Sequence, residues 1–121
     1  MPVSAPSNAR NALVVDDTPE QAELVELLLQ RLGYAVVTVN TAEAAIVAYA
    51  ALEPQIAIVD LLLPGIDGWA LVTAMKRDVP GCLLLVTSVL ELDEYPVVDG
   101  VLPKPFSAAQ LAAELDRMFA A

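Results

Sequence analysis

Five short apolar runs are spaced along the chain, and polar side chains capable of phosphate or metal chemistry follow four of them. In chain order these side chains are Asp16 and Asp17 after residues 13–15, Asp60 after 56–59, Thr87 and Ser88 after 83–86, and Lys104 after the last run. Apolar runs without polar alternation are typical of parallel strands covered on both faces. The polar ends of such strands share one edge of the sheet, where open α/β sheets bind ligands. This edge is therefore the predicted functional site.

Segments with helical periodicity separate the apolar runs. We expect helices over residues 19–32, 41–52, 68–77 and 107–119. The first is the clearest, because leucines recur on one face, glutamates occupy the other, and Gly33 follows as a stop signal. The alternation predicts an α/β fold: a doubly wound, five-stranded parallel sheet in the order 2-1-3-4-5 with helices on both faces. Residues 11–121 would form this single domain, and residues 1–10 a flexible N-terminal tail.

The order 2-1-3-4-5 places the first and third strands side by side. Asp16, Asp17 and Asp60 would then converge in one crevice, flanked by Thr87 and Lys104. Three adjacent carboxylates raise one another's pKa unless a cation compensates them, and Mg²⁺ prefers such oxygen ligands. A phosphoryl group could bridge the metal ion and Lys104, and the Thr87 hydroxyl could donate a hydrogen bond to it. The set predicts phosphoryl transfer to a carboxylate.

Composition narrows the possible chemistry. The chain of 121 residues has one cysteine and no histidine, which excludes an internal disulfide and histidine-based acid–base or metal chemistry. Its formal net charge is −10, which disfavours direct binding to nucleic acid and to anionic membranes. No apolar run reaches the roughly 20 residues of a membrane span, and the first residues do not resemble a secretory signal. We therefore expect a cytoplasmic protein without membrane insertion.

Four sequence blocks resemble the receiver domains of bacterial two-component response regulators, which have a CheY-like, flavodoxin-like fold. The blocks are residues 14–17, 59–68, 86–88 and 104–106, and the resemblance covers nearly the whole chain, residues 11–119. It implies one role for each matching residue: phosphoacceptor for Asp60, Mg²⁺ ligands for Asp16, Asp17, Asp60 and the backbone carbonyl of Leu62, and phosphoryl contacts for Thr87 and Lys104.

The resemblance also implies how such a domain would act. Its phosphate would come from a phosphohistidine on a sensor histidine kinase or a histidine phosphotransfer protein, which usually contacts the first helix. If residue 121 ends the whole gene product, we expect a single-domain protein that binds a downstream protein target or serves as a phosphate sink. It would not be a turnover enzyme, since it assists only its own phosphorylation and a slow autodephosphorylation. The family further implies a cis peptide bond between Lys104 and Pro105.

Two departures from the family pattern concern the response to phosphorylation. Only sixteen residues, 88–103, separate Thr87 from Lys104, so the fourth helix is expected to be short or replaced by a loop. Val101 occupies the position of the family's aromatic switch residue. We expect a small structural response, or one confined to residues 88–96. Leu62 and Val89 are apolar where a hydrolytic water would lie, which predicts slow loss of phosphate.

Each candidate residue also has a purely structural interpretation. Asp16 and Asp17 could begin a helix, but Thr18, Pro19 and Gln21 already predict a helix cap and a capping box without them. Asp67 is expected to cap the third helix and takes no part in the predicted chemistry. Trp69, at the start of that helix, is expected to pack rather than to recognise a ligand.

Three other functions compete with that of a phosphorylated receiver: a phosphohydrolase, a nucleotide-binding protein and an interaction module. An aspartate-nucleophile phosphohydrolase needs a second acid two residues after the nucleophile, where this chain has Leu62. A nucleotide-binding protein is disfavoured because no glycine-rich loop follows the first strand. A receiver-like interaction module that is never phosphorylated stays open, because every chemical residue can be present while the geometry fails.

Overall fold

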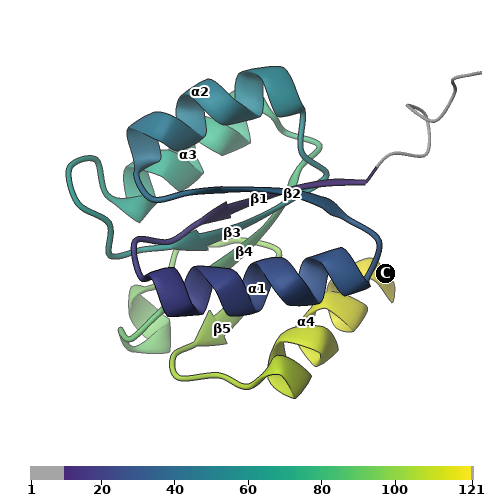
Figure 1. Cartoon of the computed structure of the whole chain (residues 1–121). Helices are drawn as coiled ribbons and strands as arrows, with labels where there is room; N and C mark the ends of the chain where they lie inside the picture. The colour runs from purple at the N-terminus through teal and green to yellow at the C-terminus, as the bar shows by residue number, and fades with distance from the viewer. Residues whose placement is uncertain (1–9, 121) are drawn as a thin grey trace, which may run out of the picture.

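The computed structural model describes residues 10–120 and has a parallel sheet between two pairs of helices (Figure 1). The strands are β1 (Asn11–Val15), β2 (Ala35–Val39), β3 (Ile56–Asp60), β4 (Leu83–Ser88) and β5 (Gly100–Pro103). Their order is β2-β1-β3-β4-β5 and every pairing is parallel, which confirms the predicted topology. The helices are α1 (Pro19–Arg31), α2 (Ala42–Leu52), α3 (Gly68–Asp78) and α4 (Ala108–Ala120). The predicted tail falls outside the described residues except for Arg10.

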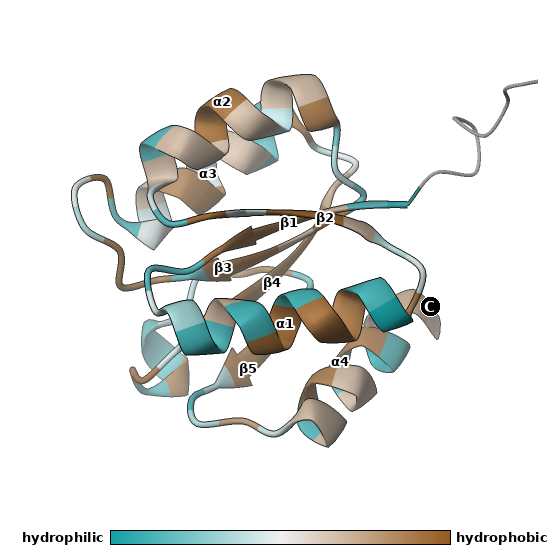
Figure 2. Ribbon diagram, viewed as in Figure 1, coloured by the Kyte–Doolittle hydropathy of each residue, from teal (hydrophilic) through white to brown (hydrophobic). Residues whose placement is uncertain are grey.

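The sheet separates two hydrophobic clusters. Leu13 and Ala57 lie in the cluster under α2 and α3, whereas their neighbours Val14 and Ile58 lie in the cluster under α1 and α4. All five residues of β3 are buried, and Figure 2 shows apolar strands between the helices, with hydrophilic and hydrophobic segments alternating along α1 and a largely apolar α2. Each large side chain buried in this way stabilises the fold by roughly 1.5–3 kcal/mol. Burial on both faces explains why these strands lack polar alternation.

The helix ends agree with the sequence prediction to within one residue. Gly33, with φ of 96°, follows the end of α1, and Glu53 closes α2 with φ of 50°. Asp67 caps α3 as predicted, because its carboxylate accepts a hydrogen bond of 2.9 Å from the Ala70 N–H. The first four N–H groups of a helix lack partners within the helix, so such a side-chain acceptor fixes where the helix begins.

The predicted cap of α1 is wrong in its chemistry. Thr18 occupies the position before the helix, but its side chain makes no capping hydrogen bond. Its N–H instead donates to Asp16 Oδ1 at 2.9 Å. Because that N–H is bound by Asp16 and not by the Gln21 side-chain oxygen, the predicted capping box does not form. An aspartate two residues earlier accepts the N–H that a capping-box side chain would otherwise bind.

A loop with a single 3₁₀ turn, Leu92–Glu94, connects β4 to β5. This confirms the prediction that the usual fourth helix is short or missing. The loop is fastened by two aromatic side chains: Trp69 Nε1 donates to the Glu94 carbonyl at 3.1 Å, and Tyr95 Oη donates to the Ser88 carbonyl at 2.8 Å. Trp69 also packs against the core cluster under α2 and α3. Lys76 Nζ on α3 hydrogen-bonds a further carbonyl of the loop.

Candidate functional site

Strand register brings the predicted residues to one edge of the sheet. Val15 is paired with Val59, so Asp16 and Asp60 leave the adjacent strands β1 and β3 at the same level. Asp60 is in turn paired with Thr87 on β4. Lys104 comes directly after β5, and its backbone N–H donates to the Ser88 carbonyl at 2.8 Å. The Lys104–Pro105 peptide bond is cis, as the family resemblance implied.

The three aspartates form a compact acidic cluster that Lys104 partly neutralises. One carboxylate oxygen from each of Asp16, Asp17 and Asp60 lies within 4.8 Å of the other two. Lys104 Nζ lies 3.0 Å from Asp60 Oδ2 and 3.2 Å from Asp16 Oδ2. Asp16 and Asp60 are buried, 6% and 5% exposed, whereas Asp17 is exposed. Three carboxylates and one ammonium group leave an excess of negative charge that a hard divalent cation could balance.

Local backbone turns fix the two buried aspartates. The Leu62 N–H donates to Asp60 Oδ1 at 3.0 Å, in the same way that the Thr18 N–H donates to Asp16 Oδ1. In each aspartate, one carboxylate oxygen therefore binds the following turn and the other faces Lys104. Such bonds restrict the rotamers of both side chains and hold the cluster in one arrangement.

Burial dominates the electrostatics of Asp60. It raises the pKa of the Asp60 carboxyl above its ordinary value, and the Leu62 N–H and the Lys104 ammonium group offset only part of this shift. The neighbouring Asp16 carboxylate raises the pKa further. Burial acts to lower the pKa of Lys104, but Asp60 and Asp16 outweigh it and raise the pKa. The crevice thus keeps its lysine charged and places an energetic cost on the charge of Asp60.

A pocket of about 310 Å³ opens onto Asp60 and Lys104. Asp17 and Gln21 also line it, together with Leu62 and Val89, which are 45% and 68% exposed. Thr87 lies beside it on β4 and is 2% exposed. The structure therefore brings together every side chain predicted for the site. The role of the Leu62 carbonyl as a ligand stays a prediction.

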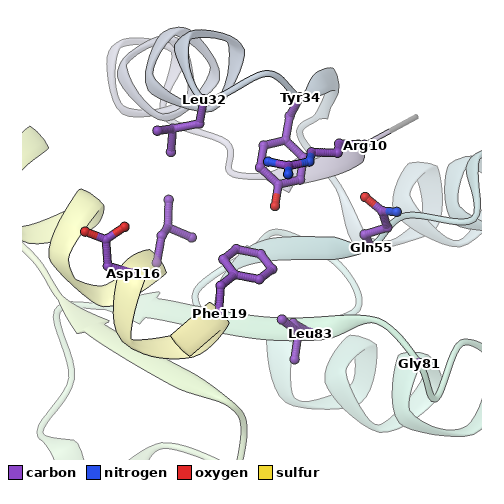
Figure 3. A pocket seen from close by; sticks show the side chains of 9 residues that line it. Arg10, Leu32, Tyr34, Gln55, Gly81, Leu83, Asp116 and Phe119 are labelled. Atoms are coloured by element: carbon purple, nitrogen blue, oxygen red, sulfur yellow. The ribbon is translucent and has the colours of Figure 1, made fainter. Parts of the chain in front are cut away.

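A larger hollow of about 950 Å³ lies at the opposite edge of the sheet (Figure 3). Tyr34 and Phe119 stack there with ring centroids 6.2 Å apart, and the Arg10 guanidinium lies 5.9 Å from the Tyr34 ring centroid. Asp116 is the single carboxylate among the residues that line it. The residues that line this hollow include no acidic cluster, unlike those around Asp60.

Two residues near the site were not assigned to it from the sequence. The sequence predicts a capping role for Gln21 and carries no signal for Tyr95. Asp16, two residues before Thr18, could have signalled that the capping box competes with an aspartate turn. Nothing in the sequence alone indicates that the Tyr95 hydroxyl returns to the Ser88 carbonyl, because that contact depends on the path of the loop.

The sheet order and the acidic crevice between β1 and β3 define a flavodoxin-like α/β protein of CheY-like topology. Within this fold class, the sequence matches one family. Residues 12–116 match the model of the response regulator receiver domain, and the chain belongs to this family of two-component signalling domains. None of the helices among residues 10–120 is long and apolar enough to span a membrane.

Curated relatives are similar to the chain over most of its length. A probable transcriptional regulator, ycf27, of Cyanophora paradoxa is 25% identical over 113 residues, which are 89% of this chain and 47% of that protein. The DNA-binding response regulator MtrA of Mycolicibacterium smegmatis is 28% identical over 110 residues, which are 85% of this chain and 47% of the relative. The chain thus spans about half the length of these relatives.

Solved receiver domains share the fold over almost their whole length. The BeF3-activated receiver domain of DrrB is 25% identical with a TM-score of 0.81, and the match covers 93% of this chain and 99% of that one. A CheY-like receiver domain from Methylobacillus flagellatus is 27% identical with a TM-score of 0.78, covering 91% and 98%. The chemotaxis response regulator CheY4 of Vibrio cholerae, 24% identical with a TM-score of 0.83 over 91% and 98%, shows the same fold.

Proposed function

We propose that Asp60 accepts a phosphoryl group and that its phosphorylated form carries the signal of this receiver domain. The observation that carries the proposal is the contact of the Asp60 carboxylate with Lys104 at 3.0 Å inside an acidic pocket. An isolated buried carboxylate at this position would be costly, and neighbouring carboxylates increase that cost. Phosphoryl transfer supplies a function that needs this arrangement.

In the proposed reaction an Asp60 carboxylate oxygen attacks the phosphorus of a phosphohistidine. A new O–P bond forms as the P–N bond breaks, and the imidazole nitrogen keeps the bonding electron pair. The phosphohistidine reacts with its second ring nitrogen protonated, so the products are an acyl phosphate on Asp60 and a neutral imidazole on the donor. The Lys104 ammonium group already hydrogen-bonds the attacking carboxylate, and it would pair with the negative charge of the added phosphoryl group. Thr87, opposite Asp60 on β4, would donate its hydroxyl hydrogen to a phosphoryl oxygen.

The residues present fit a magnesium ion. Asp16, Asp17 and Asp60 supply three oxygen ligands close enough to share one ion, and the exposed Asp17 leaves the cluster open to solvent. In this proposal the three aspartates and the Leu62 carbonyl would hold Mg²⁺. Bound there, the ion would neutralise charge on the phosphoryl group during its transfer.

The proposed donor is a sensor histidine kinase or a histidine phosphotransfer protein, since the chain has no histidine. The exposed leucines of α1, Leu24 and Leu27, lie on the helix that follows the acidic turn and suit contact with such a donor. The phosphorylated domain would act on a downstream protein target in the cytoplasm or serve as a phosphate sink. It would not turn over a separate substrate. DNA binding belongs to the named relative MtrA.

The test is the intact mass of the protein after incubation with acetyl phosphate and Mg²⁺. We expect one added phosphoryl group in the wild type and none in Asp60→Asn or with excess chelator. An adduct that persists in Asp60→Asn would contradict the assignment of the phosphoacceptor. Failure of both acetyl phosphate and a phosphohistidine protein donor to phosphorylate the wild type would favour an interaction module that is never phosphorylated.

A further inference from the structure

One buried polar atom distinguishes the first turn of α1. Gln21 Nε2 is the single buried side-chain nitrogen or oxygen among residues 10–120 that lacks a hydrogen-bond partner. Leaving a buried amide N–H unpaired is costly, and a folded protein usually satisfies such a group with a protein atom, water or ligand. This amide therefore needs a partner that residues 10–120 do not supply.

The turn before the helix leaves the Gln21 side chain without its capping role. In a capping box, the Gln21 side chain would bind the Thr18 N–H. That N–H donates instead to Asp16 Oδ1 at 2.9 Å, where it helps to fix a residue of the acidic cluster. The geometry that orients Asp16 thus releases Gln21 from its usual structural role.

The position of Gln21 connects it with the phosphoacceptor. Gln21 lines the same pocket as Asp60 and Lys104. Leu62 and Val89, which also line this pocket, are apolar side chains that can neither donate nor accept a hydrogen bond. Apart from Lys104 and the Thr18 hydroxyl, the Gln21 carboxamide is the only side-chain donor that lines the pocket.

The geometry points to Gln21 as a further phosphoryl-binding residue, whose Nε2–H donates to a phosphoryl oxygen on Asp60. This inference rests on the proposed function and deepens it. A phosphoryl oxygen is a strong acceptor, and its arrival would satisfy the buried donor without adding charge to the crevice. The residues that could hold Mg²⁺ are Asp16, Asp17 and Asp60. Gln21 would therefore contact the phosphoryl group without changing the affinity for Mg²⁺.

Beryllofluoride, added with Mg²⁺ as a stable phosphoryl mimic, tests the contact by NMR titration of the Thr87 and Lys104 amides. The main variant is Gln21→Leu, which keeps the side-chain volume and removes the amide. We expect its dissociation constant for beryllofluoride to rise about tenfold, as loss of a hydrogen bond to a charged acceptor requires. Gln21→Glu should bind still more weakly, because it adds a negative charge. The matched control is Gln30→Leu, which changes an exposed glutamine on the same helix and should leave the affinity unchanged.

The possible results distinguish failure of the proposed phosphorylation from failure of the role of Gln21. Wild-type protein that binds Mg²⁺ but no beryllofluoride would overturn the proposed function together with the role of Gln21. Wild-type binding that Gln21→Leu leaves unaltered would overturn the role of Gln21 alone, even if that variant unfolds at a different temperature. A tenfold loss of beryllofluoride affinity with unchanged affinity for Mg²⁺ alone would establish the contact.

Discussion

Lys104 is the only cation within salt-bridge distance of the buried aspartates among the described residues. Its ammonium group bridges carboxylates from β1 and β3, two strands that are distant in sequence from Lys104 itself. Removing one member of a buried ion pair commonly costs about 3–5 kcal/mol, because the remaining charge loses its partner. Loss of the lysine should therefore destabilise the crevice strongly.

Leu62 should control how long the phosphoryl group stays on Asp60. Its side chain is partly exposed in the pocket and cannot orient a water molecule for attack on phosphorus. We expect Leu62→Asn to shorten the lifetime of the phosphorylated form about tenfold, the effect of roughly one added hydrogen bond to the attacking water. The measurement is the decay of the phosphorylated mass after removal of acetyl phosphate. Leu27→Asn, an exposed leucine on α1, is the control, and equal lifetimes in all three proteins would contradict the prediction.

Gly68 allows the backbone after Asp60 to approach the start of α3 closely. A Cβ atom at this position would lie 2.4 Å from the Leu61 Cα and 2.6 Å from the Asp60 carbonyl oxygen. Because both are backbone atoms, Gly68→Ala should destabilise the protein by about 2 kcal/mol or more in urea unfolding. Gly81→Ala is the matched control, since its Cβ would meet nothing within 4 Å. Equal stability of the two variants would show that the turn rearranges without cost.

Much of the site could be predicted at the scale of residues, because strand ends place side chains by a simple rule. Asp60 and Thr87 follow apolar runs, and the register of β3 and β4 then brings them level. The cap of α1 could not be predicted in the same way. Two local patterns compete for the Thr18 N–H, and propensity alone does not decide between Asp16 and Gln21.

At the scale of elements, the connection between β4 and β5 differs most from a regular doubly wound unit. It has no apolar helix face, and it is attached to the rest of the protein by hydrogen bonds and by the partly buried side chains of Leu90, Tyr95 and Val98. The Ser88 carbonyl is the innermost of these attachments, because it accepts both the Lys104 backbone N–H and the Tyr95 hydroxyl. Any movement of Lys104 or of the end of β4 would therefore reach Tyr95 directly.

The structural response to a phosphoryl mimic should be concentrated in this loop. We expect beryllofluoride to shift the amide signals of residues 88–98 more than those of the helices, and Tyr95→Phe to reduce these loop shifts by removing one hydrogen bond. Two-dimensional NMR of the amide groups measures both effects. Tyr34→Phe, which changes a ring at the opposite edge of the sheet, should leave them intact. Large shifts restricted to α4 would contradict the prediction.

A second inter-element contact joins α2 to α3 and depends on pH. The buried Tyr49 hydroxyl hydrogen-bonds Asp78, and Arg77 followed by Tyr49 lowers the Asp78 pKa below its ordinary value of 3.8. Because the folded pKa is lowered, this contribution to stability is present above the unfolded value and is lost as pH falls through the folded pKa. Burial raises the pKa of Tyr49 to about 12 from 10.0, so ionisation should destabilise the fold between these values.

Replacing Tyr49 by phenylalanine tests this contact. We expect Tyr49→Phe to lower the urea midpoint at pH 7 and the difference from wild type to diminish below pH 3.8. The loss of stability above pH 10 should be smaller in Tyr49→Phe, because phenylalanine cannot ionise. Urea titrations from pH 2.5 to 11 give the comparison, and a difference independent of pH would show that Tyr49 contributes through packing alone.

The elements themselves were predictable because each carries its own signals. Strands covered on both faces give continuous apolar runs, and Asp67, Gly33 and Pro19 mark helix ends by backbone chemistry. The path of residues 89–99 could not be predicted. It depends on hydrogen bonds from Trp69 and Tyr95 to backbone carbonyls, and such contacts leave no periodic pattern in the sequence.

For the whole molecule, the net charge of −10 makes stability sensitive to ions. We expect the unfolding temperature to rise between 20 and 500 mM NaCl, and millimolar Mg²⁺ to add stability beyond NaCl of equal ionic strength. Binding at 100 times the dissociation constant stabilises a folded protein by about 2.7 kcal/mol. Asp17→Asn should remove the magnesium increment and keep the salt effect, as thermal unfolding would show. An unchanged magnesium increment in Asp17→Asn would contradict the proposed ligand set.

The reactivity of the single cysteine can report how the sheet opens. Cys82, just before β4, is buried in the cluster under α2 and α3, and burial followed by the Asp99 charge raises the pKa of its thiol to about 12. A thiol reagent reacts with the thiolate, so labelling at neutral pH requires the chain around β4 to open first. The labelling rate of Cys82 therefore measures how often the chain around β4 opens. A ligand that binds the crevice around Asp60 and stabilises the folded state should lower this rate.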